Sequence, residues 1–506
     1  MTPERAPIAP RGLVAVALAG LSITAGAAIQ ERGDDAPDAA PEPAVTRQKP
    51  ERGPRIDEGR DLLTASITAL ELEAHVGYLA SDELAGRDTG SAGEALAVAY
   101  IADRLEAAGW QPAGDEGSFL QRVPLTMTTV DVEPSLAEVD SEIAVQWRVD
   151  YTVLTWAPLV GELELVVAPA VDSMPVTDQA LFVPASTRER GAVLDELSAR
   201  GDEAPALVIL PGPSSAGRPG GRLPSPRLAV DSGGASFPVL RARGDLLERI
   251  EAGAVERLSV ILDVERAELP AHNVVAILPG AGTPERPELA DEVVVLSAHL
   301  DHIGTSRADA DDPDADLIYN GADDDASGVA SVIEVAEALA LGPRPARTFV
   351  SLLATGEERG LLGTREYLRR PARPLAETVF NLNFEMLGRP DALVGGPGHM
   401  WLTGFELTTL GPRCAELGIA LTPDPRPEQR FFQRSDNYAF VMEGIAAQTL
   451  SSYDLHDDYH TVRDEWWTLD YEHMEAALTV AAQAAALLGS GELTPAWIEG
   501  MQPETR

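Results

Sequence analysis

The stretch from Val293 to Gly328 restricts what this chain can fold into more than any other part of the sequence. It begins with the apolar run VVVLSA, which predicts a buried strand, and His299 and Asp301 follow at its carboxyl end. A loop with three consecutive acids, NGADDDASG, then leads into an apolar helix. Parallel α/β sheets place their chemistry at such strand ends. An imidazole beside clustered carboxylates therefore indicates a site for a divalent metal ion.

The same order of strand, loop and helix recurs in the C-terminal half of the chain. Strands are predicted at residues 273–278, 292–298, 348–354, 378–384 and 445–450, and helices at residues 327–340, 360–369 and 470–488. This recurrence is typical of a sheet with helices on both faces. We therefore expect an α/β fold in which a mostly parallel mixed sheet lies between two layers of helices.

Residues 130–266 differ in residue pattern from the sequence on either side. Short β-type runs such as ELELVVA and ALVILPG alternate there with turn-forming segments rich in Gly, Pro and Ser. We predict an inserted, smaller β-rich α/β domain. The main domain would then consist of residues 61–129 and 267–490, followed by a tail at 491–506. The insert contains no histidine, so we do not expect it to carry the chemistry.

Two helices are predicted ahead of the insert. The first lies within residues 66–81 and the second runs from Ser91 to Gly109. Ser91 and Glu94 have the spacing of a capping box, and Gly109 stands where a helix C-cap belongs. We expect both helices to cover the main sheet.

The N-terminus has the pattern of an export signal. Arg5 and Arg11 precede an uncharged run that ends in Ala25-Gly26-Ala27, which predicts a cleaved signal peptide at residues 1–28. The run is long for a signal, so an uncleaved single-span anchor is the alternative. Residues 29–60 are rich in Pro and charge and predict a disordered linker. We therefore expect an exported protein, either periplasmic or secreted.

Charge and cysteine content narrow the possible partners and the sources of stability. The 81 acids and 39 bases among 506 residues give a formal net charge of -42, which opposes binding to nucleic acid or to an anionic membrane. Beyond the possible anchor we expect no membrane contact. Cys414 is the single cysteine, so no intrachain disulfide can form and stability must come from packing and bound metal. The sequence does not indicate the oligomeric state.

Acids and histidines that could bind metal fall at strand ends or in the loops that follow them. These residues are His299, Asp324, Glu357, Glu358, Glu385 and His460. A pair of divalent ions needs one bridging carboxylate, together with a His and a terminal carboxylate for each ion. Asp324 would bridge, with Glu358 and His460 on one ion and His299 and Glu385 on the other. Glu357 is left over as a general base, and Asp301 could fix the ring of His299 by accepting its second N–H.

Five segments in this order resemble a known family. SAHLDHIG, NGADDDASGVA, ATGEERGLLGT, NLNFEMLGR and YHTVRDE are similar to the M28 family of zinc metallopeptidases, which includes secreted bacterial aminopeptidases with two zinc ions. The segment YLASDELAGRDTGSAGEALAVAYIADRLEAAGW is also similar to exported bacterial members, so the resemblance covers about residues 61–130 and 271–488. It implies a zinc-exopeptidase fold, a peptide substrate, two Zn²⁺ (with Mn²⁺ or Co²⁺ possible) and a protease-associated domain as the insert.

The resemblance also implies individual roles and two departures. It makes Asp324 the bridge, whereas His302 is interpreted as a structural neighbour and His456 either holds a ligand residue in place or is exposed. Many members have Asp where Glu385 stands. Some have Tyr at the position of Phe432, and its hydroxyl stabilises the oxyanion. Here the ions alone would polarise the carbonyl, or a nearby donor would contribute; the candidates are Tyr453, Tyr459 and Arg434.

The function that we predict is hydrolysis of the peptide bond next to a free α-amino group. A hydroxide held between two ions would attack the carbonyl, with Glu357 carrying the proton. Three alternatives remain open. A carboxypeptidase or dipeptidase would use Arg430 or Arg434 to hold the substrate carboxylate. A glutaminyl cyclase would use one zinc on the same fold. A non-catalytic peptide-binding protein would share the scaffold alone.

Overall fold

The computed structural model describes residues 66–130, 133–139, 143, 145–167, 178–184, 190–212, 227–228, 237–306 and 315–504. The predicted signal peptide and linker lie outside these residues. The chain divides into two compact units, a main unit of residues 1–123 and 271–506 and an inserted unit of residues 124–270. The insert boundaries lie slightly outside the predicted 130–266, because β2 (Leu120–Val130) and β11 (Val264–Leu278) each run through a boundary without a break.

The main unit is built on a mixed sheet whose centre is parallel. The strand order is β16-β15-β17-β14-β12-β13-β11, with bounds Leu421–Pro423, Met400–Leu402, Ala447–Ser451, Thr378–Phe384, Val293–His299, Thr348–Ala354 and Val264–Leu278. Strand β12 pairs in parallel with β13 and β14, and β14 pairs in parallel with β17. Strands β11 and β15 run antiparallel to β13 and β17. The predicted fold class, a mostly parallel mixed sheet covered by helices, is therefore confirmed.

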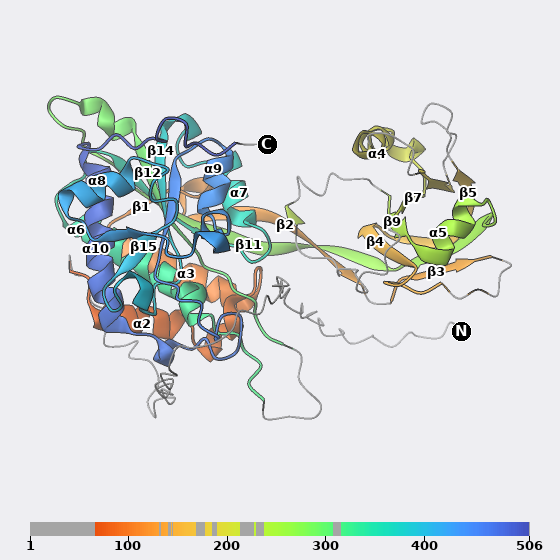
Figure 1. The fold of residues 1–506 in the computed structure, drawn as a ribbon, viewed down its shortest axis with the longest axis horizontal. Coiled ribbons are helices and arrows are strands. Elements are labelled where there is room, and N and C mark those ends of the chain that lie inside the picture. The colour runs from red at the N-terminus through yellow and green to blue at the C-terminus, as the bar shows by residue number, and fades with distance from the viewer. Residues whose placement is uncertain are drawn as a thin grey trace, which may run out of the picture. The chain divides into compact units, whose positions relative to one another are not determined.

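Helices cover both faces of this sheet (Figure 1). Val294 and Leu296 of β12 pack into a core with α2 (Ala69–Leu79), α3 (Ala92–Ala107), α6 (Gly328–Leu341) and α10 (Tyr471–Ser490). Val293 and Val295 point to the opposite face and pack with α7 (Leu362–Arg369) and α9 (Asn437–Met442). A strand buried on both faces reads as a continuous apolar run, which explains the sequence of β12. The polar residue of β12 that could bind metal, His299, therefore stands at the carboxyl end of the strand.

The start of α3 shows where local sequence rules needed correction. Ser91 Oγ accepts the main-chain N–H of Glu94 at 3.1 Å, as the capping box predicts. The carboxylate of Glu94, however, accepts the N–H of Gly90 and the hydroxyl of Thr355 instead of the N–H of Ser91. The N–H of Ser91 donates to the carbonyl of Asp88 instead. The N–H of Ser91, which a full capping box would pair with Glu94, is therefore paired within the turn before the helix.

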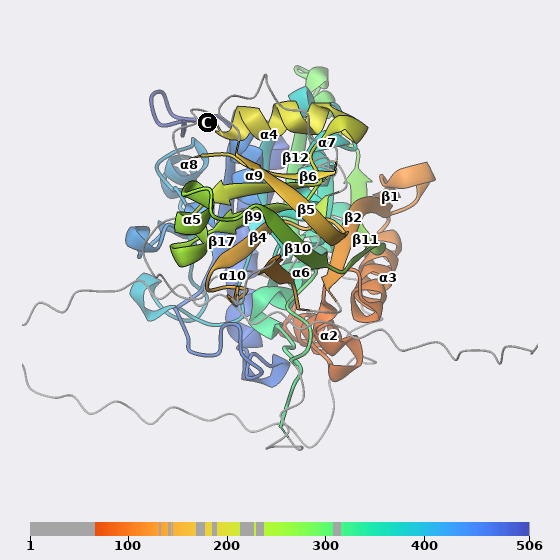
Figure 2. The same ribbon diagram turned by 90° about the vertical axis from the view of Figure 1, so that its right-hand side faces the viewer.

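The inserted unit has a sheet of its own, with β4, β5, β9 and β10 labelled in Figure 2. The strand order is β3-β10-β5-β6-β7-β9-β4, with bounds Ser135–Glu138, Arg257–Leu262, Leu159–Val167, Gln179–Phe182, Leu207–Pro211, Val239–Ala242 and Tyr151–Thr155. Ala180 and Phe182 pack in the core with α5 (Gly244–Glu251). Leu181 packs on the other face in the core that contains Val193 of α4 (Arg190–Ala199). The insert thus has the predicted β-rich α/β composition, and its kinship to protease-associated domains stays a prediction.

Among the helices within the described residues, none combines the length and apolar character needed to cross a membrane.

Candidate metal centre

The candidate ligands gather because their strands are neighbours in the sheet. His299 ends β12, and the turn η7 (Ala322–Ser327) carries Asp324. Glu357 and Glu358 follow β13, and Glu385 follows β14 directly. His460 lies in the segment after β17. Strands β12, β13, β14 and β17 are parallel, so these residues meet at one edge of the sheet.

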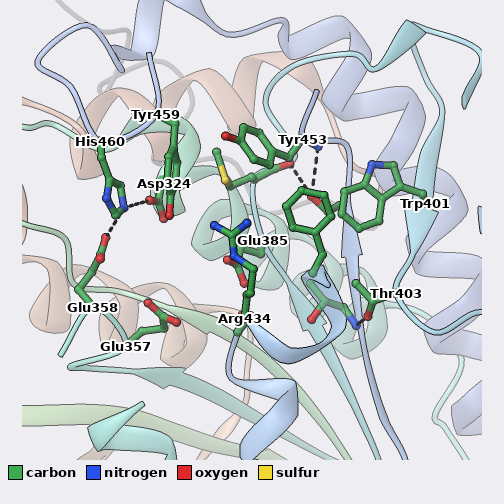
Figure 3. Close-up of a pocket in the computed structure, with 15 residues that line it drawn as sticks. Asp324, Glu357, Glu358, Glu385, Trp401, Thr403, Arg434, Tyr453, Tyr459 and His460 are labelled. Carbon is green, nitrogen blue, oxygen red and sulfur yellow. Dashed lines mark hydrogen bonds and ion pairs between the residues drawn. The ribbon is translucent and has the colours of Figure 1, made fainter. Parts of the chain in front are cut away.

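Asp324 stands between two of the predicted histidine ligands, His299 and His460. Figure 3 shows Asp324 beside His460. Its Oδ1 lies 3.1 Å from Nε2 of His299, and its Oδ2 lies 2.9 Å from Nε2 of His460. Nε2 of His460 also lies 3.2 Å from Oε1 of Glu358. A carboxylate that offers one oxygen to each of two imidazoles has the geometry expected of a bridging ligand.

Glu357 and Glu385 line the same pocket as Asp324. Neither of them, nor the predicted ligand His299, belongs to the group of donor atoms around Asp324 that all lie within 4.8 Å of one another. The carboxylate of Glu385 accepts a long contact of 3.5 Å from Nδ2 of Asn383. Glu357 is partly buried, and its main-chain N–H donates to Oδ1 of Asp301 at 3.1 Å.

His302 was interpreted from the sequence as a structural neighbour, but in the structure it lies among the candidate metal-binding atoms. Its Nδ1 lies 3.0 Å from Oε1 of Glu358 and 3.9 Å from Oδ2 of Asp324. Within the described part of the chain, four residues around this site offer potential metal-binding atoms that all lie within 4.8 Å of one another: His302, Asp324, Glu358 and His460. The signal that could have found His302 is its place three residues after His299 in the same strand-end loop.

Asp301 contacts the ring of His299 through its main-chain carbonyl and not through its carboxylate. Nδ1 of His299 lies 3.0 Å from the main-chain carbonyl of Asp301 and 3.9 Å from its carboxylate. The prediction that the carboxylate accepts this N–H is therefore wrong, because Nδ1 lies closer to the carbonyl of Asp301 than to its carboxylate. The carboxylate instead accepts the hydroxyl of Thr89 at 2.8 Å and the N–H of Glu357. A carbonyl acceptor still favours the tautomer whose Nε2 is free to bind metal.

Two supporting residues were missed by sequence reasoning. The buried guanidinium of Arg87 donates to the carbonyls of Leu300, Asn320 and Gly321, and so ties the end of β12 to the acidic turn. The carboxylate of Asp464 accepts the main-chain N–H groups of Asp323 and Asp324, each at 3.0 Å. Both residues lie in the similar segments quoted above, but nothing in the local sequence indicates which loops they join.

The acids that flank Asp324 hold the main chain. Asp325 accepts the N–H groups of Gly328, Met386 and His299. Asp323 accepts the N–H of Gly388 at 2.7 Å, and its other oxygen lies 2.9 Å from Nε2 of His456. His456 is mostly buried. Of its two predicted roles, the contact with Asp323 fits the one in which it holds the acidic turn in place.

The electrostatics separate the carboxylates into two kinds. Burial acts to raise the pKa of Asp324, but contacts with His299 and His460 outweigh burial and hold it well below its ordinary value. Burial and Asp324 likewise act against ionisation of Glu358, yet His302 and His460 lower its pKa to about 2. Glu357 and Glu385 have raised pKa values, mainly through burial and then through neighbouring carboxylates, although His299 opposes the rise.

The pocket beside these residues has about 520 Å³ of empty space, part of which is open solvent. Its polar side contains the acids and His460, and its apolar wall is formed by Met386, Trp401, Phe431 and Tyr453. Tyr453, Tyr459 and Arg434, the predicted alternatives to an oxyanion tyrosine, all line the pocket. Phe432 does not line it and packs against Tyr438 instead.

The residues present fit a divalent metal ion. Nδ1 of His302, Oε1 of Glu358 and Nε2 of His460 are buried and have no hydrogen-bond partner among the described residues. Leaving such atoms unpaired costs free energy, which a bound cation would recover. Imidazole nitrogens and carboxylate oxygens are the donors that Zn²⁺ uses in catalytic sites.

Comparison with known proteins agrees with this chemistry. Residues 273–485 match the family model described as "Peptidase family M28". A "Probable zinc metalloprotease" of Pyricularia oryzae is 43% identical over 94 residues, which span 18% of this chain and only 16% of that relative. The solved structure "Aminopeptidase from Aneurinibacillus sp. strain AM-1" is 18% identical, covers 87% of this chain and 98% of its own, and has a TM-score of 0.53, which shows a shared fold. The matched region, residues 273–485, contains every predicted ligand, and over these residues the chain is similar to peptidase family M28.

Proposed function

We propose that this protein is an exported two-metal aminopeptidase, which hydrolyses the peptide bond next to a free α-amino group. The observation that carries the proposal is the position of Asp324, with one oxygen facing His299 and the other facing His460. Glu357 stands in the same pocket outside this set of donors. A bridging carboxylate with an unused acid nearby is what two-metal hydrolysis requires.

His299, Asp324 and Glu385 would hold one ion, and Asp324, Glu358 and His460 would hold the other. When bound, such ions supply Lewis acidity toward water and toward a carbonyl oxygen. Zinc is the metal that the family implies, and the same donors accept Mn²⁺ or Co²⁺.

Glu357 would move the proton. Its carboxylate would take a proton from the attacking water and return it to the nitrogen of the leaving amine. The hydrogen bond from its N–H to Asp301 fixes the start of the side chain, and burial gives it a raised pKa. A base with a raised pKa holds the abstracted proton more readily until the amine departs.

The wall of Met386, Trp401, Phe431 and Tyr453 would receive the side chain of the N-terminal residue. An apolar, partly aromatic wall favours substrates with a large apolar side chain, because burial contributes about 25 cal/mol per Å². We therefore expect leucyl or phenylalanyl substrates to be cleaved faster than glycyl or aspartyl ones.

Arg434 favours one alternative. Its guanidinium lines the pocket and could bind the carboxylate of a C-terminal residue, as a carboxypeptidase or dipeptidase requires. The acidic remainder of the pocket favours an amine. Substrates blocked at one end separate the two activities.

The test is a matched panel of leucyl-anilide, N-acetyl-leucyl-anilide, an N-blocked peptide with a free carboxylate and a dipeptide, each assayed with and without chelator. An aminopeptidase cleaves the free-amine anilide, spares its acetylated twin and loses activity with chelator. Cleavage of the N-blocked peptide alone would identify a carboxypeptidase. One ion per chain with cyclisation of N-terminal glutamine would identify a glutaminyl cyclase, and two bound ions without turnover would identify a binding protein.

Export is a separate part of the proposal and rests on the sequence of residues 1–28. Expression in a Gram-negative bacterium followed by fractionation and mass determination of the N-terminus tests it. The expected product starts after Ala27 or Ala28 in the periplasm or medium. A cytoplasmic product with an intact N-terminus would contradict it.

A further inference from the structure

We propose that His302 is a fourth protein ligand, through Nδ1, of the ion that Asp324, Glu358 and His460 hold. The inference rests on the proposed metal binding and goes beyond it, because His302 stands outside the ligand set that two-metal hydrolysis requires. It would make the two metal positions unequal.

The distances between the four donor atoms fit a tetrahedral site. Nδ1 of His302 lies 3.0 Å from Oε1 of Glu358 and 3.9 Å from Oδ2 of Asp324. Nε2 of His460 lies 2.9 Å and 3.2 Å from the same two oxygens. Zinc bonds of about 2.0–2.1 Å in a tetrahedron separate neighbouring ligand atoms by about 3.3 Å. The four separations lie on both sides of that value.

These donor atoms also make no hydrogen bonds with one another. Nδ1 of His302, Oε1 of Glu358 and Nε2 of His460 are close, yet none of them makes a hydrogen bond within the described residues. Donor atoms that lie close together without hydrogen bonds keep lone pairs that a cation between them could accept. The rings of His302 and His460 are steeply inclined, at 72° with centroids 5.6 Å apart, as two imidazoles facing one ion would be.

His302 is held firmly in this position. Its side chain is fully buried, and its main-chain N–H donates to the carbonyl of Arg87 at 3.2 Å. The ring packs so closely on Gly321 that a Cβ there would lie 2.5 Å from Cδ2 of His302. Gly321 also has a φ of +57°. Glycine at this position lets the ring and the acidic turn approach each other.

A consequence is that the two ions should differ in affinity. Four protein donors close a zinc site, whereas three leave a position for water or substrate. The ion with His302 would be held tightly, and the ion with His299 and Glu385 would be the one that exchanges readily. Chelator should therefore remove the two ions in separate steps.

The experiment measures zinc per chain in purified protein equilibrated with graded concentrations of a chelator. Wild type, His302→Ala and His302→Asn are compared, with His473→Ala as control. His473 is equally buried but contacts Ser452 and Gly398 instead of the donors. The expected result is that His302→Ala weakens the tight step by more than about 100-fold, beyond the 10–100-fold that an outer partner costs. His473→Ala leaves both steps unchanged.

Cobalt substitution provides a second measurement, independent of activity. The visible spectrum of Co²⁺ in the tight position should change when His302 is replaced by Ala, and added imidazole should restore it. If His302→Ala does not fold, His302→Asn serves, because its Oδ1 can take the place of Nδ1, and an altered cobalt spectrum is again expected. Unchanged zinc steps and an unchanged spectrum in the folded variant would overturn the role of His302. Wild-type protein that binds no ion would instead overturn the proposed function.

Discussion

Asp301 and Glu357 are joined by a hydrogen bond of 3.1 Å from the main-chain N–H of Glu357 to Oδ1 of Asp301. Oδ2 of Asp301 accepts the hydroxyl of Thr89, and its carbonyl receives the ring of His299. One residue therefore sets the position of both a candidate ligand and the candidate base. A shift of Asp301 would therefore move His299 and Glu357 together.

Replacement of Glu357 by Gln tests the proton-transfer role. The amide keeps the shape but cannot accept the proton, so kcat on leucyl-anilide should fall by about 10²–10⁴-fold while KM changes little. Zinc content should remain that of wild type. Glu416→Gln, on the exposed surface of α8 (Leu410–Leu417), is the matched control and should keep full activity. Full activity in metal-loaded Glu357→Gln would refute the assignment.

Tyr459→Phe tests the oxyanion donor. Tyr459 stacks on His460, with ring centroids 3.9 Å apart, and it lines the same pocket as Glu357 and Glu358. Loss of an oxyanion donor typically lowers kcat by about 10²–10³-fold, and we expect the lower end with unchanged KM. Tyr453→Phe is the comparison and should reduce kcat less than 10-fold. A larger effect at Tyr453 would reverse the two roles.

Arg87→Lys tests how the ligand loops are held together. The three N–H groups of a lysine radiate from one atom and cannot reach the carbonyls of Leu300, Asn320 and Gly321 as the guanidinium fork does, so buried acceptors remain unpaired. We expect the free energy of unfolding to fall by about 2–4 kcal/mol in urea denaturation of the metal-free protein. The exposed Arg413→Lys should change it by less than about 0.5 kcal/mol. Equal stability of Arg87→Lys and wild type would show that these contacts do not contribute.

Glu334→Gln tests the buried cluster of Glu71, Glu334 and Glu337, which lie on helices α2 and α6. Burial, and then the neighbouring Glu71, raises the pKa of Glu334 to about 9, and its Oε1 lies 3.2 Å from Nε2 of His75. Between pH 4.5 and 9 the folded state keeps a proton that the unfolded state has released, so this residue's contribution to stability falls as pH rises through that window.

The variant should therefore gain stability relative to wild type as pH rises. We expect similar unfolding free energies near pH 5 and an advantage of at least about 1 kcal/mol for Glu334→Gln at pH 8.5. Chemical denaturation at both pH values, with metal content held constant, measures the difference. A difference that does not change with pH would exclude the proposed titration.

Local sequence was sufficient for the central strands of the main sheet but did not predict the edge strands β15 and β16. Strands β13 and β14 begin and end at the predicted residues, because both are short runs rich in apolar and β-branched residues, TFVSLLA and TVFNLNF. Helix α10 continues to Ser490, two residues past the predicted end at residue 488, and Gly491 adopts the left-handed conformation that ends it. Boundaries are decided by such capping contacts, which are weaker signals than periodicity.

The sequence by itself determined which strand ends carry ligands, because a His or acid directly after a buried strand must lie at the edge of a parallel sheet. Tertiary structure alone decided which donors face one another. His302 reaches Glu358, Asp464 reaches the acidic turn and the carbonyl of Asp301 replaces its carboxylate. The physical reason is that these contacts join loops far apart in the chain, and their separation depends on strand order and loop path, neither of which residue periodicity encodes.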